Sequence, residues 1–210
     1  MTKRVPEGTL AGVTEAQTTV LETDRLILRR LTMDDLEPLA KLYADPRVRR
    51  HFPEGTLTYE QTEEELQWII DVYYARYGYG LWATVLKEDA KFIGRCGLLP
   101  WTIIEGRDGG IALTNAGHGT DDAAGIDVEV AYLLAEEYWG QGLATEAAQA
   151  IVEYAFERLN MKRLICLFDP ENQASRRVAE KAGFAFERDV EVDGEPSPLY
   201  AISRIRETHP

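Results

Sequence analysis

The sequence predicts a single α/β domain, because helical and strand-like hydrophobic patterns alternate along one chain of globular composition. Of its 210 residues, 45% are hydrophobic and 28% are charged, which argues against a disordered chain. A chain of this length can bury roughly 70% or more of its unfolded surface around one core. We therefore expect one domain over residues 21–210, preceded by a loosely held, polar N-terminal tail over residues 1–20.

The N-terminal part of the domain predicts one strand followed by two helices. The segment LETDRLILRRL alternates in the manner of a strand. Thr32 and Thr58 each precede a run of apolar residues at helical spacing, and each is followed three residues later by a side chain that completes a capping box. The first helix should end before Pro46, and the second should end at Gly78.

The middle of the chain predicts a hairpin, an insertion and the central strand. Residues 81–99 form two apolar runs around a polar turn, as in a β-hairpin. Residues 100–124 contain scattered glycines, so we expect a long insertion there, with a short ribbon at 111–113. The segment GIDVEVAYLLA, at 125–135, alternates cleanly and is the expected central strand.

The C-terminal part predicts two helices separated by a strand, and then a strand pair. One helix is expected over residues 142–159, with Asn160 as a left-handed residue at its end. The strand RLICLF follows, and then a short helix over residues 172–182 that Gly183 closes. The segments FAFERDVEV and SPLYAISRI give the final pair of strands.

Charge and cysteine usage exclude several classes of function. The chain has 23 Lys and Arg against 36 Asp and Glu, a net charge of −13, which argues against a nucleic-acid partner and favours a cationic one. Cys96 and Cys166 lie far apart, and the three histidines lack metal-ligand spacing, so no metal is expected. The sequence shows neither a signal peptide nor a long apolar run, which predicts a cytoplasmic protein without a membrane partner.

The most informative segment is the turn Gly140-Gln141-Gly142, between the central strand and the next helix. Free backbone N–H groups at a helix start, which glycines let a ligand approach closely, form an anion site suited to a pyrophosphate. A Rossmann-type NAD-binding enzyme is one alternative, with Thr145 replacing the third glycine and Asp169 as the ribose-binding acid. Only about forty residues follow Asp169, fewer than a doubly wound half requires. A turn that merely reverses the chain is a further alternative.

Three motifs in this order, EVAYLL, YWGQGLATEA and NQASRRVAEKAGF, resemble those of the GNAT N-acetyltransferase superfamily. The resemblance is to its branch of ribosomal-protein N-terminal acetyltransferases (RimJ/RimL-like) and covers residues 21–205. It implies the GNAT acyl-CoA N-acyltransferase fold, a mixed, mostly antiparallel and splayed sheet flanked by helices. It also implies that acetyl-CoA is the co-substrate and that the acetyl group moves directly to a primary amine.

The identity of the amine stays open between two classes. The resemblance implies a protein or peptide N-terminal α-amine, whereas the acidic composition equally suits a small polycationic amine such as an aminoglycoside or a polyamine. Every charged residue from Glu54 to Asp71 is acidic, and Arg107 is the only Lys or Arg from Glu105 to Glu137. By resemblance these segments border the acceptor. A non-catalytic acyl-CoA sensor is an alternative of a different class, and the protein is expected to be a monomer or a homodimer.

The resemblance assigns the coenzyme contacts to two neighbouring segments. The pantetheine would lie along Leu133 and Leu134, where the central strand splays from RLICLF. Asn172 would bond the pantetheine and also cap its helix. The superfamily turn usually begins with Arg or Gln, whereas this chain has Trp139 there. The pyrophosphate would be held by backbone N–H groups of Trp139, Gly140, Gln141, Gly142, Leu143, Ala144 and Thr145.

Two residues are candidates for the acid–base chemistry. Glu129 is the candidate base, because it shares a strand face with Asp127 and a pair of carboxylates there would raise one pKa. The alternatives are a solvated strand face and a charge partner. Ser175 matches the family serine that would protonate the departing thiolate, although it could equally be a local backbone partner, and Tyr132 or Tyr138 could serve instead.

Two further groups of basic side chains lie outside the catalytic pair: the basic edge of a helix, and a histidine. A basic edge on the helix at 172–182 could meet the coenzyme 3′-phosphate, although solvated helix charge explains it nearly as well. His51 is expected to be a satisfied surface histidine. The basic edge consists of Arg176, Arg177 and Lys181.

Overall fold

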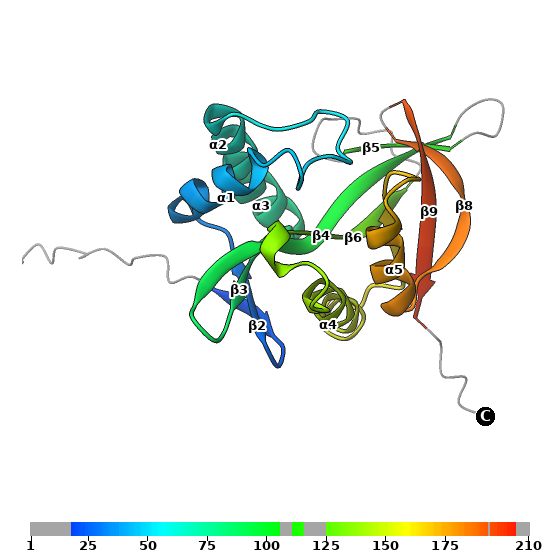
Figure 1. Ribbon diagram of the computed structural model, residues 1–210. Helices are drawn as coiled ribbons and strands as arrows, with labels where there is room; N and C mark the ends of the chain where they lie inside the picture. Colours follow the sequence, from blue (N-terminus) through cyan, green and yellow to red (C-terminus); the bar gives the residue numbers. More distant parts are fainter. Residues whose placement is uncertain (1–17, 106–110, 116–124, 193, 205–210) are drawn as a thin grey trace, which may run out of the picture.

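The computed structural model describes residues 18–105, 111–115, 125–192 and 194–204. Within them, nine strands form one mixed sheet in the order β1-β2-β3-β4-β5-β8-β9-β7-β6 (Figure 1). All neighbouring pairs are antiparallel except β5–β8 and β6–β7. The strands are β1 (Thr19–Glu22), β2 (Leu26–Arg30), β3 (Leu81–Leu86), β4 (Lys91–Glu105), β5 (Ile111–Asn115), β6 (Ile126–Leu134), β7 (Arg163–Leu167), β8 (Ala185–Val192) and β9 (Glu195–Ser203).

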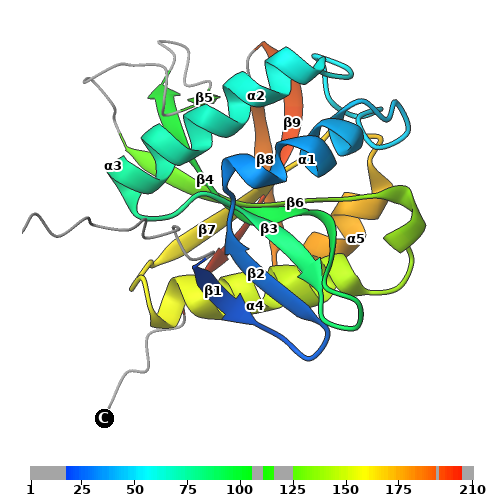
Figure 2. The ribbon, with the colours of Figure 1, turned by 90° about the vertical axis from the view of Figure 1, so that its left-hand side faces the viewer.

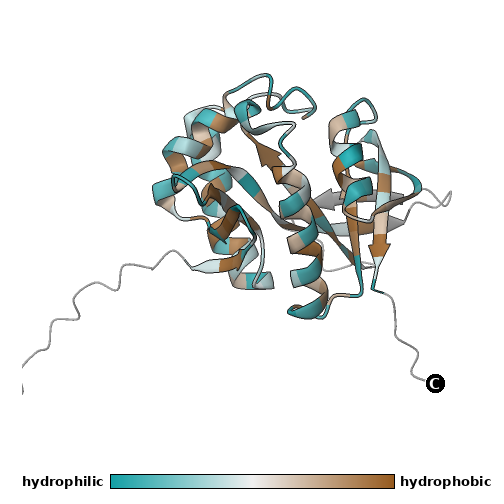
Figure 3. Cartoon of the chain, turned by 60° about the horizontal axis from the view of Figure 1, so that its bottom comes forward, coloured by the Kyte–Doolittle hydropathy of each residue, from teal (hydrophilic) through white to brown (hydrophobic). Residues whose placement is uncertain are grey.

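Helices cover both faces of this sheet. Figure 2 shows α1, α2 and α3 on one side and α4 and α5 on the other. In Figure 3, hydrophobic residues are frequent on the strands, and hydrophilic and hydrophobic residues alternate along the helices. The helices are α1 (Leu36–Tyr43), α2 (Tyr59–Trp68), α3 (Ala75–Tyr77), α4 (Leu143–Glu157) and α5 (Gln173–Lys181), with shorter 3₁₀ turns η1 (Met33–Asp35) and η3 (Glu136–Tyr138) and a π-helical segment η2 (Ile69–Tyr74).

The helix boundaries follow the local signals in the sequence. The Thr58 backbone N–H donates to Gln61 Oε1 at 2.8 Å, and the Gln61 N–H donates back to Thr58 Oγ1, which completes the predicted capping box. Gly78, after α3, and Asn160, after α4, both have positive φ, as expected for residues that end helices. No helix in the described part of the chain is long and apolar enough to span a membrane.

Strand β4 is the longest strand and joins the two halves of the sheet. One edge pairs first with β3 and then with β5, while the other edge pairs with β6. Strands β4, β5, β8, β9, β7 and β6 therefore follow one another in a ring that returns to β4. A small hydrophobic cluster draws residues from five of these strands, separately from the main core, and its buried members are Leu113, Ile165, Val190 and Leu199.

Strands β6 and β7 share a single paired position, Glu129 opposite Ile165. Beyond it, β6 continues to Leu134 while pairing only with β4. The two parallel strands therefore part toward their carboxyl ends and leave a gap in the sheet. This splayed pair confirms the predicted fold class.

The structure corrects two predicted boundaries. Strand β1 begins at Thr19, so the ordered strand region starts two residues before Leu21; residues 1–17 of the predicted tail lie outside the described residues. The predicted insertion begins with regular structure, because residues 100–105 continue β4 and the ribbon at 111–113 is strand β5. Because β4 pairs with β5 on one edge and with β6 on the other, it continues to Glu105, into the segment that was predicted to be an insertion.

Candidate active site

Glu129 lies in the middle of β6, at the position where β6 and β7 last pair. Its side chain is only 8% exposed, so the alternative of a solvated strand face is wrong. The Trp101 indole Nε1 donates a hydrogen bond to Glu129 Oε2 at 2.7 Å. Burial raises the pKa of Glu129 to about 7, against the opposing effects of the Trp101 bond, the Arg95 charge and the Leu167 backbone N–H.

The cause of this raised pKa differs from the sequence expectation. Asp127 does share the strand face of Glu129, but its Oδ1 accepts from Arg163 Nε at 3.2 Å. Arg163 also pairs with Glu187 on β8. Because the Arg163 guanidinium compensates the Asp127 charge, the proposed carboxylate pair is the wrong explanation; desolvation of Glu129 raises its pKa.

Arg95 is a buried cation near Glu129 that the sequence pattern did not predict. Its side chain, on β4, is 5% exposed, and its Nε donates to Tyr43 Oη at 2.6 Å. The Tyr43 hydroxyl in turn donates to Glu65 Oε1 at 2.8 Å. Fully buried arginines are rare without partners, so an arginine inside an otherwise apolar strand was the available signal.

Tyr132, Ser175 and Asn172 form a second group on the other face of β6. Tyr132 is three residues from Glu129, so the two side chains point to opposite faces of the strand. The Tyr132 hydroxyl donates to the Ser175 carbonyl oxygen at 2.8 Å, and burial raises the pKa of Tyr132 well above its usual range. The Ser175 N–H donates to Asn172 Oδ1 at 3.0 Å, which makes Asn172 the N-cap of α5.

The glycine turn has the backbone geometry that an anion site requires. Gly140 and Gly142 have φ of +72° and +80°, a region that side-chain-bearing residues rarely adopt. Gly142 is the N-cap of α4, and its carbonyl oxygen accepts from the Glu146 N–H. By helix geometry, the N–H groups of residues 143–145 have no acceptor within the helix. This donor set fits a pyrophosphate.

The turn is held in place from both sides. The Trp139 indole donates to the Leu134 carbonyl oxygen at 2.8 Å. Arg25, from the β1–β2 connection, donates to the Gln141 carbonyl oxygen at 3.0 Å and forms an ion pair with Glu146. Arg25 was not predicted, because its partners are distant in sequence. Leu133 and Leu134, the predicted pantetheine contacts, are buried at the end of β6 beside the gap.

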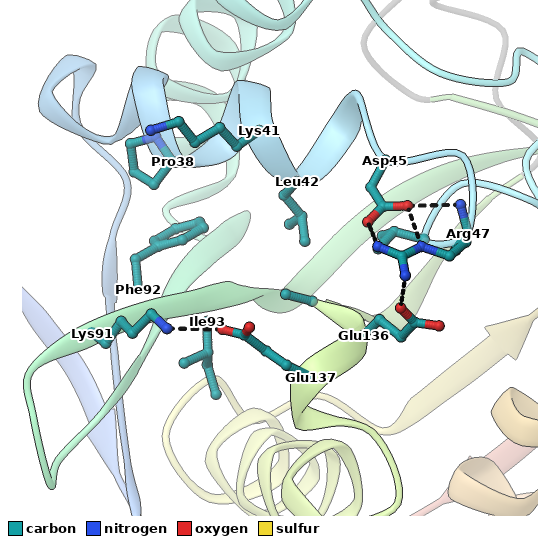
Figure 4. Close-up of a pocket in the computed structure, with 12 residues that line it drawn as sticks. Pro38, Lys41, Leu42, Asp45, Arg47, Lys91, Phe92, Ile93, Glu136 and Glu137 are labelled. Carbon is teal, nitrogen blue, oxygen red and sulfur yellow. Dashed lines mark hydrogen bonds and ion pairs between the residues drawn. The ribbon is translucent and has the colours of Figure 1, made fainter.

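A pocket of about 780 Å³ lies between α1, the start of β4 and η3. It contains none of the predicted site residues, and two ion pairs cross it, Arg47–Glu136 and Lys91–Glu137 (Figure 4). It borders the segment that leads from β6 into the glycine turn. Its lining consists of Pro38, Lys41, Leu42, Asp45, Arg47, Val48, Lys91, Phe92, Ile93, Ala135, Glu136 and Glu137.

The parted parallel strand pair and the glycine turn that follows it are the arrangement that the resemblance to the GNAT acyl-CoA N-acyltransferase fold implied. Residues 25–185 match the family described as Acetyltransferase (GNAT) domain, and the chain belongs to that family. It is an acetyl-CoA-dependent N-acetyltransferase. The Rossmann-type NAD-binding alternative is wrong, because the sheet is mostly antiparallel and Asp169 is bonded to His51.

The chain is similar to the following protein sequence and two solved structures. The chain is 31% identical over 183 residues to the uncharacterized protein YkkB of Bacillus subtilis (strain 168), covering 87% of this chain and 94% of that protein. An acetyltransferase structure from Agrobacterium tumefaciens (str. C58) is 27% identical with a TM-score of 0.68, covering 88% of this chain and 94% of that one. The ribosomal alpha-N-protein acetyltransferase RimL in complex with coenzyme A is 19% identical, with a TM-score of 0.63 and coverage of 88% and 97%.

Glu129 gives folding a pH dependence whose sign follows from its raised pKa. A carboxyl group whose pKa is near 4.5 in the unfolded chain and about 7 in the folded protein stabilises the fold at low pH and loses that contribution as pH rises through 7. We expect the free energy of unfolding of the wild type to fall by about 3 kcal/mol relative to Glu129→Gln between about pH 4 and pH 8. Urea unfolding at several pH values measures this difference. A difference that stays constant over the range would contradict the raised pKa.

Proposed function

We propose that this domain transfers the acetyl group of acetyl-CoA directly to the α-amine of a protein or peptide N-terminus. The observation that carries the proposal is a buried carboxyl group, Glu129, with a pKa of about 7 at the point where β6 and β7 part. A base with a pKa near the working pH is the most effective in proton transfer.

The coenzyme would lie across the gap and the glycine turn, where it supplies an acetyl thioester. Backbone N–H groups of the turn, from Trp139 to Thr145, would bind its pyrophosphate. Leu133 and Leu134 would contact the pantetheine, and the side-chain amide of Asn172 would bond it while its Oδ1 caps α5. No side chain of this chain needs to carry the acetyl group, because the amine attacks the thioester carbon directly.

Glu129 would remove the proton that the amine loses as the N–C bond forms, acting through a water molecule. At pH 7 about half of a group with a pKa of about 7 is deprotonated. An α-amine has a pKa of about 7.7–8.0, against about 10.4 for a lysine-like amine, so a far larger fraction of it is neutral and nucleophilic. This match favours an N-terminal amine.

The departing thiolate needs a proton, and two groups on the opposite face of β6 can supply it. Ser175 is the donor that we propose from the family motif. Tyr132 is its neighbour, and burial keeps its hydroxyl protonated. Comparing kcat of Ser175→Ala and Tyr132→Phe distinguishes the two, because only the true donor should be costly to remove.

A small polycationic amine is the second candidate acceptor. The net charge of −13 and the exposed carboxylates of α2, such as Glu60, Glu63 and Glu64, favour it. The buried guanidinium of Arg95 opposes it, since further positive charges on the acceptor would approach a cation close to Glu129. The N-terminal amine carries no such penalty.

An acceptor screen tests the proposed function. We expect thiol release from acetyl-CoA with peptides that have a free N-terminus, and none with the same peptides after N-terminal acetylation. Spermidine and an aminoglycoside form the second arm. Turnover confined to that arm would overturn the N-terminal assignment, and binding of acetyl-CoA without turnover of any amine would favour the sensor.

Glu129→Gln should lower kcat/KM at pH 7 at least tenfold, which corresponds to about 1.4 kcal/mol of transition-state stabilisation. The change removes the base and preserves the shape of the side chain. Glu153→Gln, at an exposed position on α4, is the matched control and should retain full activity. A loss of less than tenfold in Glu129→Gln would rule out Glu129 as the base.

Gly142→Ala should weaken binding of coenzyme A about tenfold, because a residue with a Cβ costs roughly 1–2 kcal/mol in the left-handed region and would deform the turn. Gly194, in the β8–β9 turn, has a φ of +90°, and a Cβ added there would meet no other atom within 4 Å. Gly194→Ala therefore imposes a similar backbone strain far from the glycine turn. Calorimetry with coenzyme A should show unchanged affinity for Gly194→Ala; equal affinities in both variants would contradict the assignment.

A further inference from the structure

The loop between α1 and α2 contacts both sides of the gap between β6 and β7. We call residues 45–52 of this loop the strap. On the β6 side, the Arg50 guanidinium lies over the Trp139 ring at 5.5 Å. On the β7 side, His51 Nδ1 lies 2.8 Å from Asp169 Oδ2. Since Trp139 follows β6 and Asp169 follows β7, the strap crosses the carboxyl ends of the parted strands.

The bonds within the strap fix the orientation of Arg50. Its Nε donates to His51 Nε2 at 3.1 Å. Because an arginine Nε can only donate, His51 Nε2 accepts, and the proton of the neutral ring is on Nδ1, which donates to Asp169. Asp169 Oδ1 also accepts from the Glu171 N–H at 2.7 Å. His51 thus connects Arg50 to the start of the loop that leads into α5.

The neighbouring Arg49 anchors the strap to the core. Its side chain is buried, and its Nε donates to the Gly55 carbonyl oxygen at 2.6 Å. Its guanidinium lies over the rings of Phe52 and Tyr43. The strap is therefore a fixed platform that presents Arg50, which is exposed, beside the glycine turn.

The carboxylates around the glycine turn would weaken the binding of an anion, so a cation at this position would favour it. Three carboxylates surround the turn and would repel an anion, but each has a basic partner from another part of the chain. The pairs are Glu136 with Arg47, Glu137 with Lys91, and Glu146 with Arg25 (Figure 4 shows the first two). Arg50 differs from these three cations, because the described residues provide no carboxylate partner for its guanidinium.

We propose that Arg50 is a coenzyme-binding residue that the strap presents to the pyrophosphate of acetyl-CoA. The inference rests on the proposed position of the coenzyme. The indole of Trp139, at the start of the glycine turn, forms the surface on which Arg50 lies. The two Nη groups of Arg50 are donors suited to phosphate oxygens. His51 and Asp169 are positioning residues for it.

The test compares binding of coenzyme A and of pantetheine, which lacks the pyrophosphate, by calorimetry. Arg50→Gln should weaken binding of coenzyme A about tenfold and leave binding of pantetheine unchanged, since a charged hydrogen bond to phosphate is lost. Arg50→Lys keeps the charge and should recover part of the affinity. Arg76→Gln is the matched control, because Arg76 is exposed and also lies 5.5 Å over an aromatic ring, that of Tyr77.

The outcomes separate this inference from the proposed function. Wild-type affinity for coenzyme A in Arg50→Gln would overturn the role of Arg50 alone. An equal loss of coenzyme A and pantetheine binding would also overturn it, because Arg50 would then affect the whole coenzyme site and not the pyrophosphate in particular. Failure of the wild type to bind coenzyme A would overturn the proposed coenzyme position itself. Circular dichroism on each variant checks that the fold is intact.

Discussion

The single paired position between β6 and β7 is the constraint on which the rest of the site depends. Strands that stayed paired to their ends would close the sheet and leave no opening for a pantetheine. Because they part after Glu129 and Ile165, the end of β6 pairs with β4 alone, and the segments after β6 and β7 separate. Glu129 thereby lies at the base of the gap, and Trp139 and Asp169 lie at its two sides.

Charge compensation is the second constraint, since an acidic chain must still bind an anionic coenzyme. With a net charge of −13, the protein places carboxylates on both sides of the glycine turn. Arg25, Arg47 and Lys91 neutralise them through ion pairs between segments that only the fold brings together. The pairs of Arg47 and Lys91 are exposed and that of Arg25 is half-exposed, so each contributes little stability, and their main effect is on the local potential.

The cause of the raised pKa of Glu129 could not be inferred from its neighbours in sequence. Strand alternation placed Asp127 and Glu129 correctly on one face and suggested that their charges interact. In the folded protein Arg163 approaches from β7 and compensates Asp127, while Trp101, from β4, bonds Glu129. Burial then sets the pKa of Glu129, and burial depends on the strands packed around the residue.

Features that depend on contacts within a few residues could be predicted from the amino-acid sequence. Capping at Thr58 and Asn172, the left-handed Asn160 and the glycine turn all followed from local backbone and side-chain chemistry. Alternation likewise placed Glu129 on the central strand. The extent of β4, the burial of Arg95 and the contact of His51 with Asp169, 118 positions away, became apparent only in the folded chain. Such contacts join segments whose approach depends on sheet order and strand parting, which no local pattern encodes.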